Sequence, residues 1–245
     1  MIIDNMHDAI EEITDNSIIM IPGFGPGAPW NLLKELYKKK LCNLTIIANS
    51  VGLSHGDSNI KTIGDFILNG MVKKIICSFT ASPHPSIKGP AEQLILDKKL
   101  FSEVVTQGAL AEKIRAAAAG LGGFYTKTSI NTKLAENKKI KVINKQSYVF
   151  EEPLHADFSL IRAFKADKAG NLIYRLAARN FNPIMAAAAK KTIVEVEQEI
   201  EDVRKINSEY IHTPSIYVNR LVQIPKNGIF EVDLLALRTK TRKND

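Results

Sequence analysis

The strongest constraint on the fold is an alternation of short, continuously apolar runs with stretches of helical periodicity. Residues 17–21 (SIIMI) form an apolar run between polar or breaking residues, which is typical of a strand buried on both faces. Residues 30–40 follow with apolar side chains at helical spacing, and residues 44–48 are again apolar and β-branched. This repetition predicts βαβ units, and hence a parallel sheet with helices on its faces.

The pattern continues along the chain, with a change of character in the second half. Residues 120–139 lack clear periodicity and are expected to form an ordered loop. Between 140 and 175 short apolar runs recur, which predicts strands that can pair antiparallel, with residues 168–171 (KAGN) as a hairpin turn. Asn182-Pro183 is expected to cap and begin a helix. The other expected elements are helices at 63–70, 108–120 and 182–190, and strands at 72–79, 103–105, 192–197 and 216–224. The predicted fold is therefore α/β, with an open, mostly parallel sheet flanked by helices and antiparallel strands in the second half.

Composition excludes several classes of protein. The chain has 245 residues, of which 45% are hydrophobic and 24% charged, as in ordinary globular proteins. We predict a single domain over residues 1–245 with a polar tail at about 226–245. The net charge of +7 suits an anionic ligand, but aromatic residues do not interleave with the lysine pairs, so no nucleic-acid partner is expected.

The amino-terminal residues, the apolar runs and the two cysteines predict where the protein is located and that its thiols are reduced. The first 16 residues are acidic and lack the basic and apolar parts of a signal peptide. No stretch approaches the length of a membrane span, so we expect a cytoplasmic protein with no membrane association. Cys42 and Cys77 each lie in an apolar run and are expected to be reduced core residues.

The glycine-rich loop at residues 22–29 (PGFGPGAP) is the main candidate for ligand binding. It connects a predicted strand to a predicted helix, where backbone amides can face an anion. Its spacing fits the G-x-G-x-x-A pattern of dinucleotide-binding loops, but residues 37–56 contain no acid for a ribose, and Pro26 and Pro29 lack amide protons. A ligand-contacting loop, a purely structural turn and a dinucleotide site remain open alternatives.

No self-contained catalytic set is visible in the residues. The five histidines show no metal-binding spacing, and neither a nucleophile elbow nor a zinc motif occurs. Glu151-Glu152 is the nearest approach to a paired carboxylate, but neighbouring strand residues point to opposite faces, so we expect a solvated strand end. We therefore expect no metal site.

Six segments, in order along the chain, resemble the alpha subunit of the family I CoA-transferases. They cover roughly residues 10–224, and the ARNFNP and IHTPSIYV parts are the most specific. The segments FYTKT and NRLVQ are most similar to the succinyl-CoA:3-oxoacid branch, with the acetate/butyrate–acetoacetate branch as its neighbour. The six segments are DNSIIMIPGFGPGAP, TQGALAEKIRAAAAGLGGFYTKT, LAENK, ADFSLIRAFKADKAGNLIYRLAARNFNP, TIVEVEQEIE and IHTPSIYVNRLVQ.

The resemblance implies an open α/β sheet, coenzyme A thioesters as substrates, no permanently bound cofactor, and a heterodimer or heterotetramer with a beta subunit. It implies ping-pong chemistry in which the beta subunit provides a glutamate that attacks the acyl-CoA, so that no catalytic residue is expected in this chain. A non-catalytic CoA-binding protein on the same fold is the alternative, and a nicotinamide-dependent enzyme is a weaker one. The residues that the resemblance places at the substrate are Gly23, Phe24, Gly25, Pro26, Gly27, Ala28, Asn49 and Gln107.

Several positions depart from the family's pattern. Pro22 replaces the first residue of Gly-Gly-Phe, and Thr106 replaces the proline of Pro-Gln-Gly. Ala117 and Ala118 replace the two adjacent glycines of Arg-Ala-Gly-Gly-Ala-Gly, Lys127 replaces a proline, and residues 129–131 (SIN) replace a glycine-bearing run. These changes lead to the hypothesis of an altered acyl pocket with unchanged chemistry.

Overall fold

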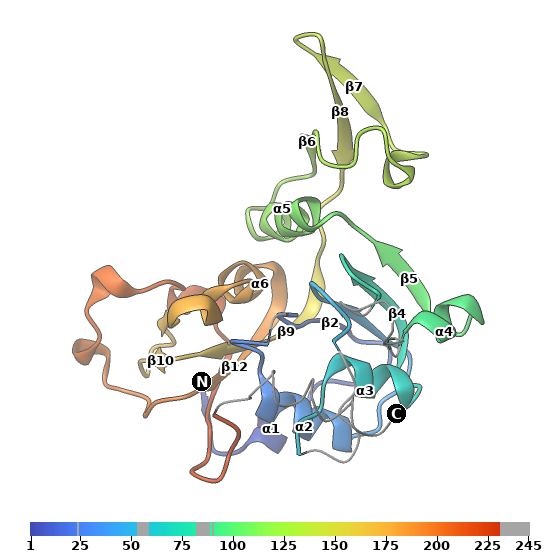
Figure 1. Cartoon of the computed structure of the whole chain (residues 1–245). Helices are drawn as coiled ribbons and strands as arrows, with labels where there is room; N and C mark the ends of the chain where they lie inside the picture. The colour runs from blue at the N-terminus through green and yellow to red at the C-terminus, as the bar shows by residue number, and fades with distance from the viewer. Residues whose placement is uncertain (24, 53–58, 82–88, 90, 231–245) are drawn as a thin grey trace.

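The computed structural model describes residues 1–23, 25–52, 59–81, 89 and 91–230 (Figure 1). At its centre is an eight-stranded sheet in which all neighbouring strands are parallel. Its strands are β1 (Ile2–Ile3), β2 (Ile18–Met20), β3 (Leu44–Ile47), β4 (Val72–Cys77), β5 (Phe101–Val104), β9 (Ala156–Ala163), β12 (Ala189–Val196) and β13 (Arg220–Gln223). Their order in space is β1-β13-β12-β9-β2-β3-β4-β5. The predicted open parallel sheet is confirmed.

Helices cover both faces of this sheet. Figure 1 shows α1, α2 and α3 on one side, and α5 and α6 on the other. The helices are α1 (Met6–Ala9), α2 (Trp30–Lys38), α3 (Ile63–Leu68), α4 (Glu92–Leu96), α5 (Gln107–Ala118) and α6 (Asn182–Ala188). Short 3-10 helices lie at Lys133–Ala135, Leu176–Arg179, Val203–Lys205, Ser208–Tyr210 and Ser215–Tyr217. In the part of the chain that is described, no helix combines the length and apolar character needed to span a bilayer.

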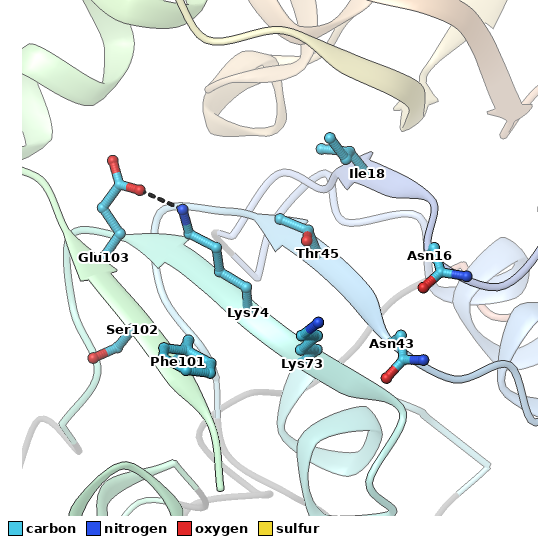
Figure 2. Close-up of a pocket in the computed structure, with 9 residues that line it drawn as sticks. All are labelled: Asn16, Ile18, Asn43, Thr45, Lys73, Lys74, Phe101, Ser102 and Glu103. Atoms are coloured by element: carbon cyan, nitrogen blue, oxygen red, sulfur yellow. Dashed lines mark hydrogen bonds and ion pairs between the residues drawn. The ribbon is translucent and has the colours of Figure 1, made fainter. Parts of the chain in front are cut away.

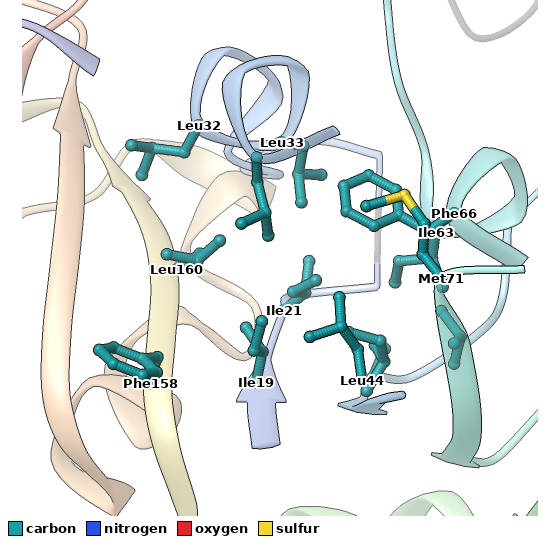
Figure 3. Close-up of a cluster of buried hydrophobic side chains, with 14 of the residues drawn as sticks. Ile19, Ile21, Leu32, Leu33, Leu44, Ile63, Phe66, Met71, Phe158 and Leu160 are labelled. Atoms are coloured by element: carbon teal, nitrogen blue, oxygen red, sulfur yellow. The ribbon is translucent and has the colours of Figure 1, made fainter. Parts of the chain in front are cut away.

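Strand β2 shows why its sequence is apolar without interruption. Ile19 and Ile21 point to the α2 side of the sheet, where Figure 3 shows Leu33 of α2 close to them. Met20, between the two isoleucines, points to the opposite face of the sheet. There it packs with other buried apolar side chains under α5 and α6. Full burial of such a side chain stabilises the fold by about 1.5–3 kcal/mol, so a polar residue at any of these positions is strongly disfavoured.

Two small antiparallel sheets complete the fold. β6 (Phe124–Thr126), β8 (Gln146–Glu151) and β7 (Ile140–Ile143) form a three-stranded sheet that stands away from the main body in Figure 1. β10 (Lys165–Ala166) and β11 (Leu172–Ile173) form the hairpin predicted around residues 168–171. Antiparallel pairing in the second half is thus confirmed for these five strands.

Three local expectations are wrong. Residues 120–139 are not all loop, since they contain β6. Strand β9 lies in the parallel sheet, because its long apolar run is buried between β2 and β12. Cys42 is exposed in the turn before β3, whereas Cys77 is buried as expected, and burial raises the pKa of its thiol to about 11.

Glu151 also differs from expectation. The sequence predicts a solvated strand end, but the Glu151 side chain is only 2% exposed. Its two carboxylate oxygens accept hydrogen bonds from Lys113 Nζ of α5 at 3.3 Å and from Lys138 Nζ at 2.6 Å. The carboxylate therefore ties the three-stranded sheet to α5, through partners that lie 38 and 13 residues away in the sequence.

Candidate substrate-binding site

The loop of residues 22–29 leaves the sheet at the point where the strand order diverges. From β2 the chain proceeds to β3, β4 and β5 on one side, whereas from β9 it proceeds to β12 and β13 on the other. Open parallel sheets bind ligands at the carboxyl ends of the strands, at this kind of switch point. The loop follows directly on the carboxyl end of β2, so the topology supports the predicted location.

Gly23 packs directly against the backbone that follows β3. A Cβ atom on Gly23 would lie 2.7 Å from the backbone nitrogens of both Asn49 and Ser50, closer than real Cβ atoms approach. The carbonyl of Gly23 accepts a hydrogen bond of 2.9 Å from Ser50 Oγ. Glycine is therefore required at position 23, because the loop lies directly on the backbone of its neighbour.

The other end of the loop is held by the segment that precedes α6. Gly27 has a φ of +80°, and a Cβ there would come within 2.3 Å of the carbonyl oxygen of Ala178. Asn180 Nδ2 donates to the carbonyl of Pro26 at 2.6 Å, and Asn182 Nδ2 donates to that of Gly27 at 3.1 Å. The two ends of the loop are thus fixed by residues far away in the sequence.

Asn182 does not cap α6 as predicted. It lies inside the first turn of α6, with Phe181 at the cap position, and its side chain is completely buried. Besides Gly27, its amide group contacts the carbonyl of Ala178 at 2.8 Å, and its Oδ1 accepts from the backbone nitrogen of Arg162 at 3.0 Å. The Asn182 side chain therefore connects the loop, the segment before α6 and β9, whereas a helix cap would bind only the helix itself.

Asn49 and Gln107 meet although they come from different strand ends. Asn49 follows β3 and is 3% exposed, and Gln107 is the first residue of α5, after β5. Gln107 Nε2 donates to Asn49 Oδ1 at 2.9 Å. With Gly23 packed on the Asn49 backbone, three of the residues expected at the substrate form one contiguous group.

The remaining expected residues lie around this group. Gly25 and Pro26 are at least partly accessible, whereas Gly27 and Ala28 are buried. The amide of Ala28 donates to the carbonyl of Gly25 at 3.3 Å, which closes a turn within the loop. Phe24 lies outside the described residues.

The amino end of α2 does not offer its amides to an outside anion, as the loop-to-helix argument assumed. The buried carboxylate of Glu195, on β12, accepts from the backbone nitrogens of Asn31 and Leu32, each at 2.9 Å. Asn31 Nδ2 donates to it at 3.1 Å, and Arg162 Nη1 lies 3.7 Å away. Burial raises the pKa of Glu195 to about 7, although Arg162 and these donors oppose the shift. An internal carboxylate therefore occupies this helix terminus.

The same network reaches residues of the predicted polar tail. Asn31 exchanges hydrogen bonds with the backbone of Ile229, at 2.7 and 3.0 Å. Arg162 donates to Glu197 at 2.9 Å and to the carbonyls of Ile229 and Phe230. The start of the tail is therefore packed against the body, while residues 231–245 lie outside the described part of the chain.

A groove lies elsewhere, at the opposite edge of the sheet. It has a volume of about 550 Å³ and is found at the amino ends of β2 to β5, opposite to the loop (Figure 2). Lys74 and Glu103 form an ion pair of 2.7 Å in it, beside Phe101, which is 65% exposed. Over the described ranges, no group of His, Cys, Asp and Glu side chains is arranged to hold a metal ion.

The loop, Asn49 and Gln107 can be named from the sequence, but the contact between Asn49 and Gln107 and the residues that hold the loop in place cannot. In the sequence, Asn180 belongs to a loop motif and Asn182 is an expected helix cap. Neither pattern indicates that these side chains bind the loop of residues 22–29. Glu195 gives no local signal, because a single acid in an apolar strand does not reveal which helix terminus it reaches.

Comparison with known proteins identifies the family to which the chain belongs. The family described as Coenzyme A transferase matches residues 3–223. The A-type subunit of the 3-oxoadipate CoA-transferase of Pseudomonas putida is 43% identical over 222 residues, covering 90% of this chain and 92% of that protein. The A-type subunit of the probable succinyl-CoA:3-ketoacid coenzyme A transferase of Bacillus subtilis (strain 168) is 36% identical over 222 residues, covering 90% and 89%.

Solved structures show the same architecture. Glutaconate coenzyme A-transferase from Acidaminococcus fermentans superimposes with a TM-score of 0.77 at 20% identity, covering 98% of this chain and 83% of that chain. At this identity the likeness supports the fold alone. The family match over most of the chain, together with relatives above 30% identity, shows that the chain belongs to the coenzyme A transferase family and is of the A type.

Proposed function

We propose that this chain, over its whole length, is the alpha subunit of a heteromeric CoA-transferase. With a beta subunit it moves coenzyme A between succinyl-CoA and a 3-oxoacid, such as acetoacetate or 3-oxoadipate. The names of two relatives support this substrate class, since one belongs to a 3-oxoadipate transferase and the other to a succinyl-CoA:3-ketoacid transferase.

The chemistry proposed is ping-pong transfer through a glutamate of the beta subunit. The glutamate carboxylate attacks the acyl-CoA to give a mixed anhydride, and the released thiolate then forms an enzyme–CoA thioester as the first acid leaves. The second acid reverses these steps and takes the coenzyme A. Dividing the transfer in this way avoids a direct exchange between two resonance-stabilised carboxylates.

The observation that carries the proposal is the rigid loop at the switch point beside the Asn49–Gln107 pair. A glycine-lined backbone allows close approach of a thioester, and both amide side chains can donate to its oxygen. By contrast, the four buried carboxylates of the described residues are all bound by internal partners; they are Asp65, Glu151, Asp167 and Glu195. This chain therefore contributes one wall of a shared site and no nucleophile.

The test is reconstitution of the purified chain with its beta subunit. We expect no transfer from succinyl-CoA to acetoacetate or 3-oxoadipate by either protein on its own, and transfer with parallel-line ping-pong kinetics by the complex. A complex that prefers acetate as the acceptor would support the acetate/butyrate branch instead. Binding of acyl-CoA by the complex without turnover would contradict the proposed function.

A further inference from the structure

The three-stranded sheet of β6, β8 and β7 forms an arm, residues 124–151, that stands away from the main sheet (Figure 1). The arm is strongly basic, because it contains six lysines but only two glutamates, Glu136 and Glu151. This small part of the chain therefore carries more than half of the net charge of +7. The six lysines are Lys127, Lys133, Lys138, Lys139, Lys141 and Lys145.

Most of this charge has no counterion. Glu151, the last residue of β8, accepts from Lys138 at 2.6 Å and from Lys113 of α5 at 3.3 Å, so the arm is fixed to that helix. The other five lysines of the arm are exposed and form no ion pair with a carboxylate of the described residues. Exposed cations without counterions attract an acidic surface and repel a second copy of the arm.

Apolar side chains are exposed between these lysines. Ile140 and Val142 lie on β7, an outer strand of the arm, and are 58% and 65% exposed. They point to one face of the strand. Lys141, between them, points to the other face, where its Nζ lies 5.7 Å from the centre of the Tyr125 ring. An outer strand with adjacent exposed apolar side chains is a site for association with another polypeptide, and the lysines make that association selective.

The arm adjoins the candidate site. Gly108, the second residue of α5, faces Thr128 of the arm: a Cβ atom on Gly108 would lie 3.8 Å from Thr128 Cγ2, an ordinary contact distance. Gln107, directly before Gly108, donates to Asn49. A polypeptide that binds the arm is therefore held beside the Asn49–Gln107 pair, where the proposed chemistry needs a glutamate from the beta subunit.

We propose that the arm is the surface through which this chain binds its beta subunit. Ile140 and Val142 supply apolar contact, and the arm lysines attract an acidic face of that subunit. A second copy of this chain does not fit, because its own arm presents the same positive charge. This inference rests on the proposed function, and it adds the place at which the subunit that carries the nucleophile is held.

Calorimetric titration of the full chain with the beta subunit tests the proposal. K139E/K141E reverses two charges beside the apolar pair, and we expect it to raise the Kd roughly 100-fold at low ionic strength, because like charges then face each other. The effect should shrink at high ionic strength, where surface charges are screened. K73E/K98E is the matched control: it reverses two exposed lysines of the main body that likewise have no ion pair among the described residues, and it should change the Kd less than about threefold.

A second variant tests the apolar part of the surface. I140S/V142S keeps the charge and should raise the Kd roughly tenfold at every ionic strength, since less apolar area is removed from water on binding. At saturating beta subunit, both arm variants should recover the wild-type kcat for CoA transfer, because the arm holds the partner and does not touch the reacting atoms.

The other outcomes separate the docking surface from the proposed function. An unchanged Kd in both arm variants, or an equal change in K73E/K98E, would overturn the docking surface. An unchanged Kd with a raised KM for acyl-CoA would overturn it too, because the lysines would then bind the phosphates of coenzyme A. If the complex assembles through the arm but transfers no coenzyme A, only the proposed function fails; if the wild-type chain does not bind the beta subunit, both fail.

Discussion

Replacing Ser129 by glycine should stabilise this protein, which is unusual for a substitution at a buried position. Ser129 is 9% exposed, has a φ of +78°, and its hydroxyl has no partner among the described residues. The turn itself is needed, because the carbonyl of Ser129 accepts from the nitrogen of Thr132 at 3.1 Å and from its Oγ1 at 2.7 Å. Glycine keeps this turn and removes both the strain and the unpaired hydroxyl.

The size of the effect follows from three contributions. Left-handed backbone costs a residue with a Cβ about 1–2 kcal/mol, and the unpaired hydroxyl costs about 1–3 kcal/mol. The greater freedom of glycine in the unfolded chain offsets about 0.5–1 kcal/mol. The net increase in the free energy of unfolding is therefore about 2 kcal/mol, which corresponds to a rise in melting temperature of about 4–8 °C for a chain of this size.

Urea unfolding of the full chain, followed by circular dichroism, measures this change directly. S129A separates the contributions, because it removes the hydroxyl but keeps the strain, and it should gain less than S129G. N131G is the matched control: Asn131 has a φ of +61°, but asparagine tolerates this region, so the gain should be small. A lower stability of S129G than of the wild type would refute the reasoning.

Three further predictions concern the scaffold of the site. Gly27→Ala should lower the free energy of unfolding by at least about 3 kcal/mol in urea titrations, because its Cβ would overlap the Ala178 carbonyl at a left-handed φ. Asn182→Ala should cost about 3 kcal/mol in the same assay, since three buried backbone groups lose their partner; a loss below about 1 kcal/mol would argue against this. Glu195 is predicted to bind more protons in the folded than in the unfolded chain between its ordinary pKa of 4.5 and about 7. Stability should therefore fall as pH rises through this window, by up to about 3 kcal/mol, and E195Q should show a flatter profile.

The parallel sheet could be predicted because its signal is local. A strand buried on both faces needs an uninterrupted apolar run, and residues 17–21 and 44–48 provide one. The place of β9 could not be predicted in the same way, because its apolar run fits either pairing direction. Only its neighbours, β2 and β12, decide that it is parallel.

The candidate site also combines residues that can be recognised in the sequence with residues that cannot. The glycines and Gln107 lie in motifs that can be read in the sequence, and Gly23, Asn49 and Gln107 do come together in the structure. Glu195 and Asn182 act through partners up to 164 residues away, so no window of sequence reveals what they bind. Long-range hydrogen bonds of buried polar groups are the part of the site that requires the fold.

The central claim is that this chain forms part of a CoA-transferase site whose nucleophile belongs to another polypeptide. The most direct measurement is to treat the complex with succinyl-CoA, reduce the thioester with borohydride, and locate the modified glutamate by mass spectrometry. The account predicts a single modified glutamate, on the beta subunit, and no modification of this chain under any condition of turnover. A modified glutamate in this chain, or CoA transfer by this chain alone, would contradict it.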